Sequence, residues 1–167
     1  MPSLASAIRS ALLTADPRAK VMATRKVVRD WRLGRLDWGF EVSMPDEPAR
    51  PQSPELLHPS KMPRRSKGSS EKGRIALWHS LAHIEFVAID LALDIVGRFG
   101  ELMGREFVDD FLAVAADEAM HFALLARKLE VLGSHYGALP AHGCLWQAAF
   151  ETRHDINARL AIVPMVL

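Results

Sequence analysis

The chain has 167 residues, of which 49% are hydrophobic and 25% are charged, a composition typical of one soluble globular domain. Its formal net charge of +1 argues against a broadly basic surface, so we expect no nucleic acid among its partners. A single cysteine, Cys144, excludes an internal disulfide, and no leader peptide or bilayer-spanning run of roughly 20 apolar residues is evident, so we expect a cytoplasmic protein that does not bind membranes.

The first part of the chain, residues 1–36, is predicted to form an N-terminal extension of two short helices. Ser3 is placed to cap the first helix, and the pair Asp16-Pro17 is typical of the start of the second. Helical periodicity then stops over residues 37–72, which are rich in proline. We expect this segment to be a strap over the surface or a linker, with the basic run "KMPRRSK" facing solvent.

Residues 73–167 regain the helical pattern and are predicted to form the bundle itself. A long helix over 74–100 is followed by the Gly-containing break "FGELMG" and by a second long helix that Gly133 ends. After a loop, a third helix is expected over 144–167, bent near Pro164. No alternation typical of strands competes with this pattern. The predicted fold class is therefore all-α, with long antiparallel helices joined by short turns.

Two carboxylates lie in the middle of apolar stripes on the first two long helices. At about 100° per residue, Glu85 shares its helix face with residues such as Leu81 and Ile89, and Glu118 shares its face with Phe111 and Phe122. A stripe of this width is expected to face the core. An isolated ionised carboxylate is costly there, so each must be paired, neutralised or bound to a metal.

The spacing of these carboxylates adds a second constraint. The midpoint between Glu85 and Glu118 falls at residues 101–102, inside the predicted turn, so an antiparallel hairpin places them at the same depth on facing helices. His121 lies one turn further along the face of Glu118. Two Glu and one His would then converge. Carboxylate with imidazole suits iron, manganese or zinc, and the share of oxygen favours a di-iron centre.

The same residues carry a resemblance to a known family. One Glu on one helix and a Glu-x-x-His on the next form half of the site in ferritin-like di-iron proteins. The chain resembles the ferritin-like family catalogued as a domain of unknown function, DUF455, over essentially its whole length. The segments that carry the resemblance are "PARPQSPELLHPSKMPRR", "LWHSLAHIEFVAIDLALD", "DEAMHFALLARKLEVLGSHYGALPAHGCLW" and "DINARLAIVPMVL".

The resemblance implies a ferritin-like bundle that lacks its last core helix. Members of the family continue after a segment like "RLAIVPMVL" with a further Glu and then a second Glu-x-x-His, whereas this sequence stops at Leu167. The only acidic residues on the expected third helix are Glu151 and Asp155, and Asp155 is placed to pair with Arg159 four residues on. Alone, the chain is expected to form a homodimer or to be poorly soluble, because the stripes would otherwise lie uncovered.

Other interpretations of these residues remain open. Glu85, Glu118 and His121 can equally form a metal-free buried cluster in a bundle that serves as a structural or interaction protein. His79 and His83 have the i,i+4 spacing of a zinc-binding pair, although ordinary hydrogen bonds between elements account for them more simply.

The function that the resemblance favours is a dimetal carboxylate oxidoreductase that uses O₂ or peroxide. Glu85, Glu118 and His121 would be the metal ligands, and iron the expected metal, with manganese or zinc as alternatives. No residue is assigned to acid–base catalysis, and the substrate stays unknown.

Overall fold

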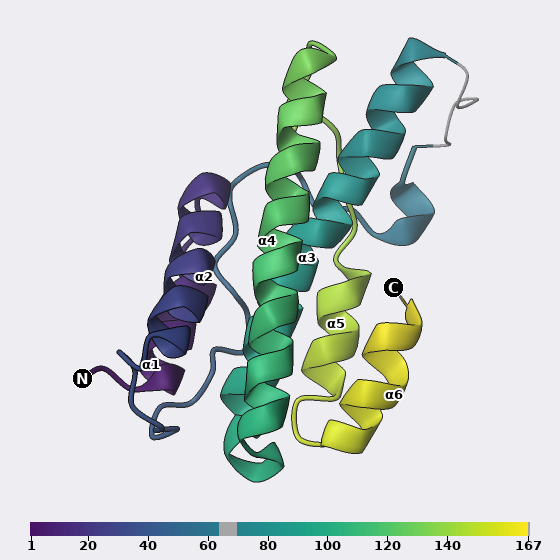
Figure 1. The fold of residues 1–167 in the computed structure, drawn as a ribbon. Helices are drawn as coiled ribbons and strands as arrows, with labels where there is room; N and C mark the ends of the chain where they lie inside the picture. Colours follow the sequence, from purple (N-terminus) through teal and green to yellow (C-terminus); the bar gives the residue numbers. More distant parts are fainter. Residues whose placement is uncertain (64–69, 167) are drawn as a thin grey trace.

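The computed structural model describes residues 1–63 and 70–166, and helices are the only extended regular elements in that part of the chain (Figure 1). The all-α bundle is thereby confirmed. In chain order the elements are α1 (Leu4–Leu12), α2 (Pro17–Arg32), the 3-10 turn η1 (Pro59–Lys61), α3 (Glu71–Met103), α4 (Arg105–Val131), α5 (Cys144–Glu151) and α6 (Ile156–Val166).

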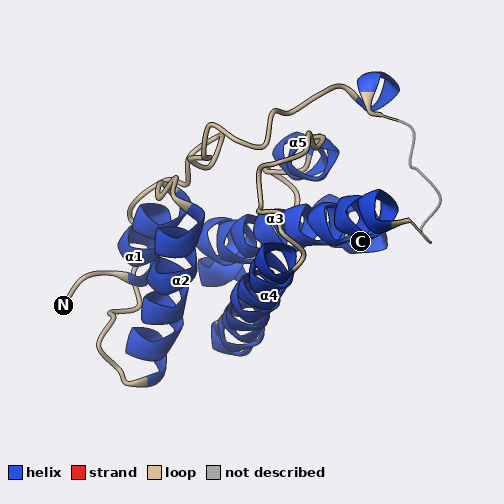
Figure 2. Ribbon diagram, turned by 90° about the horizontal axis from the view of Figure 1, so that it is seen from above, coloured by secondary structure: helices blue, strands red, loops and turns tan. Residues whose placement is uncertain are grey.

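An antiparallel hairpin of α3 and α4 forms the centre of the bundle. Gly104 alone connects the two helices, with a φ of 88° and a ψ of −179°, a conformation open essentially only to glycine. The turn therefore lies slightly later than the sequence predicted. The α1–α2 pair packs on one side of the hairpin and the α5–α6 pair on the other (Figures 1 and 2).

The two N-terminal helices begin where their capping residues predicted. The Ser3 hydroxyl accepts a hydrogen bond from the Ser6 amide at 3.2 Å, and the Asp16 carboxylate accepts one from the Ala19 amide at 2.7 Å. The ammonium of Lys20 on α2 is fully buried and lies 2.5 Å from the Asp90 carboxylate on α3. This ion pair joins the N-terminal helices to the hairpin.

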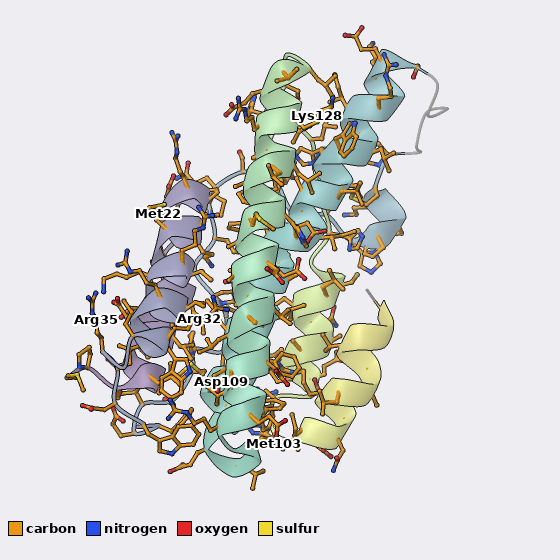
Figure 3. The ribbon with its side chains drawn as sticks, in the orientation of Figure 1. Met22, Arg32, Arg35, Met103, Asp109 and Lys128 are labelled. Atoms are coloured by element: carbon orange, nitrogen blue, oxygen red, sulfur yellow. The ribbon has the colours of Figure 1, made fainter. Side chains whose placement is uncertain are left out.

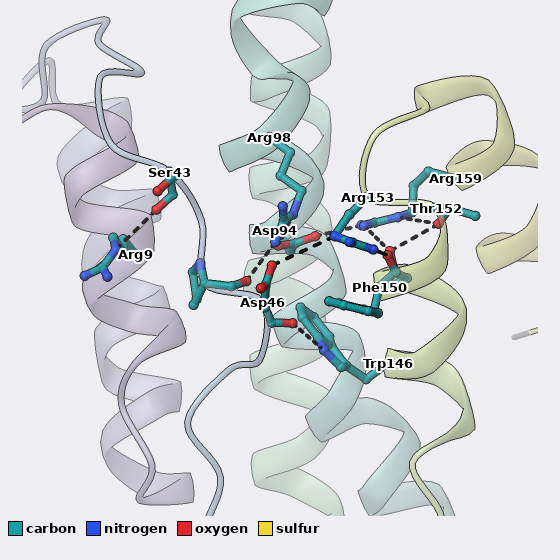
Figure 4. A network of polar contacts seen from close by, with 12 residues as sticks. Arg9, Ser43, Asp46, Asp94, Arg98, Trp146, Phe150, Thr152, Arg153 and Arg159 are labelled. Carbon is teal, nitrogen blue, oxygen red and sulfur yellow. Dashed lines mark hydrogen bonds and ion pairs between the residues drawn. The ribbon is translucent and has the colours of Figure 1, made fainter.

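The described part of the proline-rich segment lies against the bundle rather than free in solvent. Met44, Pro48 and Pro54 are buried, and the Pro45 carbonyl accepts a hydrogen bond from the Arg98 guanidinium at 2.7 Å. Farther along the chain, the Trp146 indole donates to the Asp46 carbonyl at 3.1 Å (Figure 4). Residues 64–67 of the basic run lie outside the described residues.

The single helix expected over 144–167 is wrong, because two helices occupy this stretch. The chain leaves helical geometry after Glu151, and the Asp155 carboxylate then accepts hydrogen bonds from the amides of Asn157 and Ala158 at 2.8 and 3.1 Å. Asp155 thus starts α6 as a capping residue. The break falls here rather than near Pro164, which lies inside α6.

The expected pair between Asp155 and Arg159 is also wrong. Arg159 is 1% exposed, and its guanidinium lies 2.9 Å from the Asp94 carboxylate on α3 (Figure 4). Further guanidinium hydrogen bonds go to the Thr152 hydroxyl at 3.0 Å and the Ala149 carbonyl at 2.7 Å. Arg159 therefore ties α6 to both α5 and α3.

Among the described helices, none combines the length and the apolar character needed to cross a membrane.

Candidate metal centre

The structure brings together the three residues singled out as ligands. Glu85 projects from α3, and Glu118 and His121 project from the facing side of α4. One ligand atom from each lies within 4.8 Å of the others. The His121 Nδ1 atom lies 3.3 Å from a carboxylate oxygen of Glu118 and 3.4 Å from one of Glu85. This is the single such group of three His, Cys, Asp or Glu side chains found in the described residues.

Small residues allow the two helices to approach closely beneath this cluster. Ala82 on α3 and Ala115 and Ala119 on α4 are fully buried at the contact. Next to them, the rings of Phe86 and Phe122 pack with centroids 5.0 Å apart. The buried residues that neighbour Glu85 and Glu118 along the two helices are therefore apolar.

Burial and the neighbouring Glu85 make Glu118 harder to ionise. Burial, a hydrogen bond with Glu85 and the charge of Glu85 raise the pKa of Glu118 to about 7, although His121 acts in the opposite direction. Burial alone would lower the pKa of the His121 imidazole, but hydrogen bonds and charges from Glu118 and Glu85 outweigh it and raise that pKa. At neutral pH the cluster therefore holds protons that a cation could displace.

The face that carries the cluster is only partly buried, in line with the expectation that the stripes of this chain are left partly uncovered. The side chains of Glu85, Glu118 and His121 are 24%, 21% and 46% exposed. On α4, Val114 beside them is 41% exposed. Among the described residues, α6 reaches only the side of Glu118 that faces Val163, so the rest of this side of the hairpin stays uncovered. The apolar stripes thus mark a seam that is open to solvent.

An apolar pocket of about 230 Å³ adjoins Glu118. It lies between α3, α4 and α6, and apart from Glu118 and Arg159 its walls are apolar. The Arg159 guanidinium is held by hydrogen bonds to Asp94, Thr152 and Ala149, which engage three of its five N–H donors. The walls are formed by Ala88, Leu91, Ala92, Ile95, Phe111, Val114, Glu118, Arg159 and Val163.

The sequence did not reveal the part that Arg159 plays at this pocket. Its spacing from Asp155 suggested a local pair, and no periodicity reports a partner on another helix. The one available signal was the sequence Asp155-Ile156-Asn157, which is typical of a helix start and would have separated α6 from α5.

The rival histidine pair is engaged in hydrogen bonds between elements. The His79 ring accepts from the amides of Gly137 and Leu139, at 2.9 and 3.4 Å, through one nitrogen. The His83 ring contacts the Tyr136 hydroxyl at 3.0 Å and the His142 carbonyl at 3.2 Å. Burial lowers the pKa of His79, and it lowers that of His83 to about 4, so both rings are neutral at pH 7.

The described part of the chain is an all-α helical bundle, and comparison with known proteins gives the family. The chain belongs to the family described as "Protein of unknown function (DUF455)", whose model matches residues 13–167. A protein of Haemophilus influenzae (strain ATCC 51907 / DSM 11121 / KW20 / Rd), named "Uncharacterized protein", is 39% identical over 171 residues. That match covers 96% of this chain and 59% of the relative, so the chain spans less than two thirds of its length. No solved structure matches the chain.

Proposed function

We propose that Glu85, Glu118 and His121 bind a transition-metal ion and form half of a dimetal carboxylate centre of the ferritin-like type. The observation that carries this proposal is the convergence of two carboxylates and one imidazole, from two facing helices, within 4.8 Å. Iron is the preferred metal, because carboxylate-rich sites with one imidazole suit redox-active iron, and manganese or zinc are the alternatives. The proposed activity is that of an oxidoreductase acting with O₂ or peroxide.

The chemistry of the donor set fits a cation. Burial, a hydrogen bond with Glu85 and repulsion by the charge of Glu85 together raise the pKa of Glu118 to about 7. A divalent cation would offset that repulsion and displace the shared protons. The partial exposure of all three side chains leaves a route by which an ion could enter.

The α3–α4 hairpin and the pocket beside Glu118 would both contribute to such a site. The α3–α4 hairpin sets the separation of Glu85 and Glu118, and His121 follows one helical turn later on the same face. The adjoining apolar pocket would exclude water from one side of Glu118. A bound metal would supply Lewis acidity and, for iron or manganese, electron transfer.

Three donors leave a metal site incomplete, so further ligands are part of the proposal. A ferritin-like centre receives them from a second pair of helices. Helix α6 runs antiparallel to α3, from Arg159 beside Asp94 to Val163 at the pocket that Glu118 also lines (Figure 1). A segment continuing in that direction would pass beside the cluster. For this chain alone, a second copy would supply equivalent ligands.

The same geometry supports one other function, a metal-free cluster that stabilises a structural or interaction protein. The observation in its favour is that His121 already contacts both carboxylates, so the three groups satisfy one another without an ion. The two proposals predict different changes in the stability of the metal-free protein when one carboxylate is removed.

Metal analysis of the chain and two variants tests the proposal. We expect about one metal ion per chain after purification with iron, manganese and zinc supplied, and a loss of at least tenfold in Mn²⁺ affinity for Glu118→Gln. Asp117→Asn is the matched control, because the neighbouring Asp117 is exposed and the charge change is the same. The control should bind as the parent does.

Unfolding of the metal-free variants separates the two functions. Under the metal proposal, Glu118→Gln leaves stability unchanged or raises it, because the substitution removes a like charge beside Glu85. A chain that binds no metal and loses several kcal/mol on Glu118→Gln would instead establish the structural role.

A further inference from the structure

The charge of the protein is strongly segregated along the chain. Residues 1–36 contain eight basic and two acidic side chains, whereas residues 37–167 contain thirteen basic and eighteen acidic ones. Residues 1–36 thus carry a net charge of +6, and the rest of the chain carries a net charge of −5, which gives the total of +1. Such asymmetry between parts of one chain is typical of proteins that meet an anionic partner.

Helix α2 carries most of this positive charge on its solvent side. Its buried face is formed by residues such as Val21, Val28 and Trp31, which pack into the core. The basic stripe, as we call the exposed cations of this helix and the turn after it, consists of Arg18, Arg25, Lys26, Arg29, Arg32 and Arg35. With 16 residues, α2 extends roughly 24 Å, so the stripe spans several phosphate spacings of a nucleic-acid strand.

Most of the positive charge of the basic stripe is not neutralised by carboxylates of the protein. Lys26, Arg29 and Arg35 all pair with one carboxylate, Asp30, which is 8% exposed on its side chain. In the described part of the chain, Arg18, Arg25 and Arg32 form no ion pair or side-chain hydrogen bond. Figure 3 shows Arg35 projecting outward from the end of α2, whereas Arg32 lies between α2 and Asp109 of α4.

An exposed aromatic side chain lies at the C-terminal end of the stripe. Trp38 is 43% exposed, and its ring centroid lies 6.1 Å from that of Trp31 and 5.1 Å from that of Phe40. The Arg105 guanidinium covers the ring of Trp31 at 4.6 Å. Two aromatic neighbours hold Trp38 in place while part of its surface stays open, as a platform for a stacked base requires.

We propose that the basic stripe and Trp38 bind single-stranded nucleic acid. Five of the six cations are arginine, whose planar guanidinium matches phosphate oxygens better than an ammonium does. An open tryptophan ring can stack only on an unpaired base, which favours a single strand over a duplex. An anionic membrane fits less well, because the apolar face of α2 is buried and only two large apolar side chains of this helix and the turn after it, Met22 and Leu33, are exposed for insertion. The proposal departs from the expectation drawn from net charge alone.

The acidic residues of α4 restrict where such a strand can lie. Asp109 accepts a hydrogen bond from the Trp31 indole at 2.6 Å, and Asp110 lines the same hollow between α2 and α4 as Arg32 and Arg105. These carboxylates would repel phosphates. The strand is therefore placed along the outer side of α2, away from α4, and reaches Trp38 beyond Arg35.

The test measures binding of fluorescein-labelled single-stranded RNA and DNA of about 12 nucleotides to the 167-residue chain, by anisotropy at several salt concentrations. Arg18→Glu/Arg25→Glu/Arg29→Glu should weaken binding at least tenfold and reduce the salt slope of log K by about 2, since three phosphate contacts on the outer side of α2 are lost. The matched control, Lys72→Glu/Arg74→Glu/Arg127→Glu, changes the charge equally at other exposed positions and should bind within about twofold of the parent.

Two further measurements separate this surface from general attraction. Trp38→Ala should weaken binding roughly 5- to 100-fold, and Trp38→Phe should restore most of it, because stacking needs a ring. The proposal is overturned by an absence of saturable binding at low salt, or by equal losses in both triple variants. It is also overturned if vesicles containing phosphatidylserine bind the chain through the stripe more tightly than the oligonucleotides do. None of these outcomes depends on metal binding.

Discussion

The guanidinium of Arg159 on α6 and the carboxylate of Asp94 on α3 form an ion pair at 2.9 Å in which both side chains are buried. A second cation, Arg98, reaches the other oxygen of Asp94 at 2.8 Å, so the carboxylate is bonded on both sides (Figure 4). Burial lowers the pKa of Arg159, and the charge of Asp94 opposes that effect. A pair so enclosed fixes the position of α6 against the hairpin.

Removal of one partner of this pair should be costly. Arg159→Met leaves Asp94 buried with one cation fewer, and we expect a loss of about 3–5 kcal/mol in the free energy of unfolding. Urea denaturation followed by circular dichroism measures it. Arg153→Met is the control, because Arg153 approaches the exposed Asp46 only at 3.9 Å and should cost about 1 kcal/mol or less. Equal losses in both variants would show that Asp94 is not tied to α6 as described.

Acid should destabilise the protein through His83. Burial lowers the pKa of this ring to about 4 in the folded state, below the 6.5 that is usual for histidine. The folded protein therefore resists protonation, and stability present above pH 6.5 is lost as the pH falls through 4, by up to about 3 kcal/mol. We expect His83→Gln to flatten this part of the stability profile, whereas His58→Gln, at an exposed position, should leave it unchanged. If His83→Gln loses as much stability between pH 6.5 and 4 as the parent does, His83 is not the group responsible.

Metal affinity should rise with pH around neutrality. The pKa of Glu118 is raised to about 7 and that of His121 is also raised, so both groups hold protons that an ion must displace. Calorimetric titration with Mn²⁺ should show affinity increasing through pH 6 to 8 and proton release that depends on the buffer. Asp117→Asn should keep this dependence. A pH-independent affinity would indicate binding at other groups.

The turn between the long helices should tolerate only glycine. Gly104 has a φ of 88° with a ψ of −179°, and no heavy atom would touch an added Cβ, so the cost of a side chain there is purely conformational. We expect Gly104→Asn to lose about 1–3 kcal/mol. Gly34, with a φ of 64°, lies in the left-handed region that asparagine accepts. Gly34→Asn should therefore cost less in the same thermal or urea unfolding experiment.

Residues that act within one helix or across one short turn were predictable from the sequence. Capping by Ser3 and Asp16 follows from local hydrogen bonding, and the meeting of Glu85 with Glu118 and His121 follows from helix periodicity and the position of one turn. Their assignment as metal ligands stays a prediction.

Long-range partners could not be read in this way. The pairs Lys20–Asp90 and Arg159–Asp94 join different helices, and no period in the sequence reports which helix lies opposite. The apolar stripe around Glu118 predicted a buried helix face. Only the part of that face that packs against another helix is buried. A hydrophobic pattern shows that a helix face is suited to burial, but it does not show which segment packs against that face.

The one-residue connection at Gly104 also constrains how the family can change in length. An added residue anywhere in the helical stretch between Glu85 and Met103 would rotate Glu85 by about 100° and shift it by about 1.5 Å relative to His121. A turn this short has no slack to absorb the change. Relatives that keep the cluster should therefore show neither insertions nor deletions between the two glutamates, whereas longer surface connections tolerate changes in length.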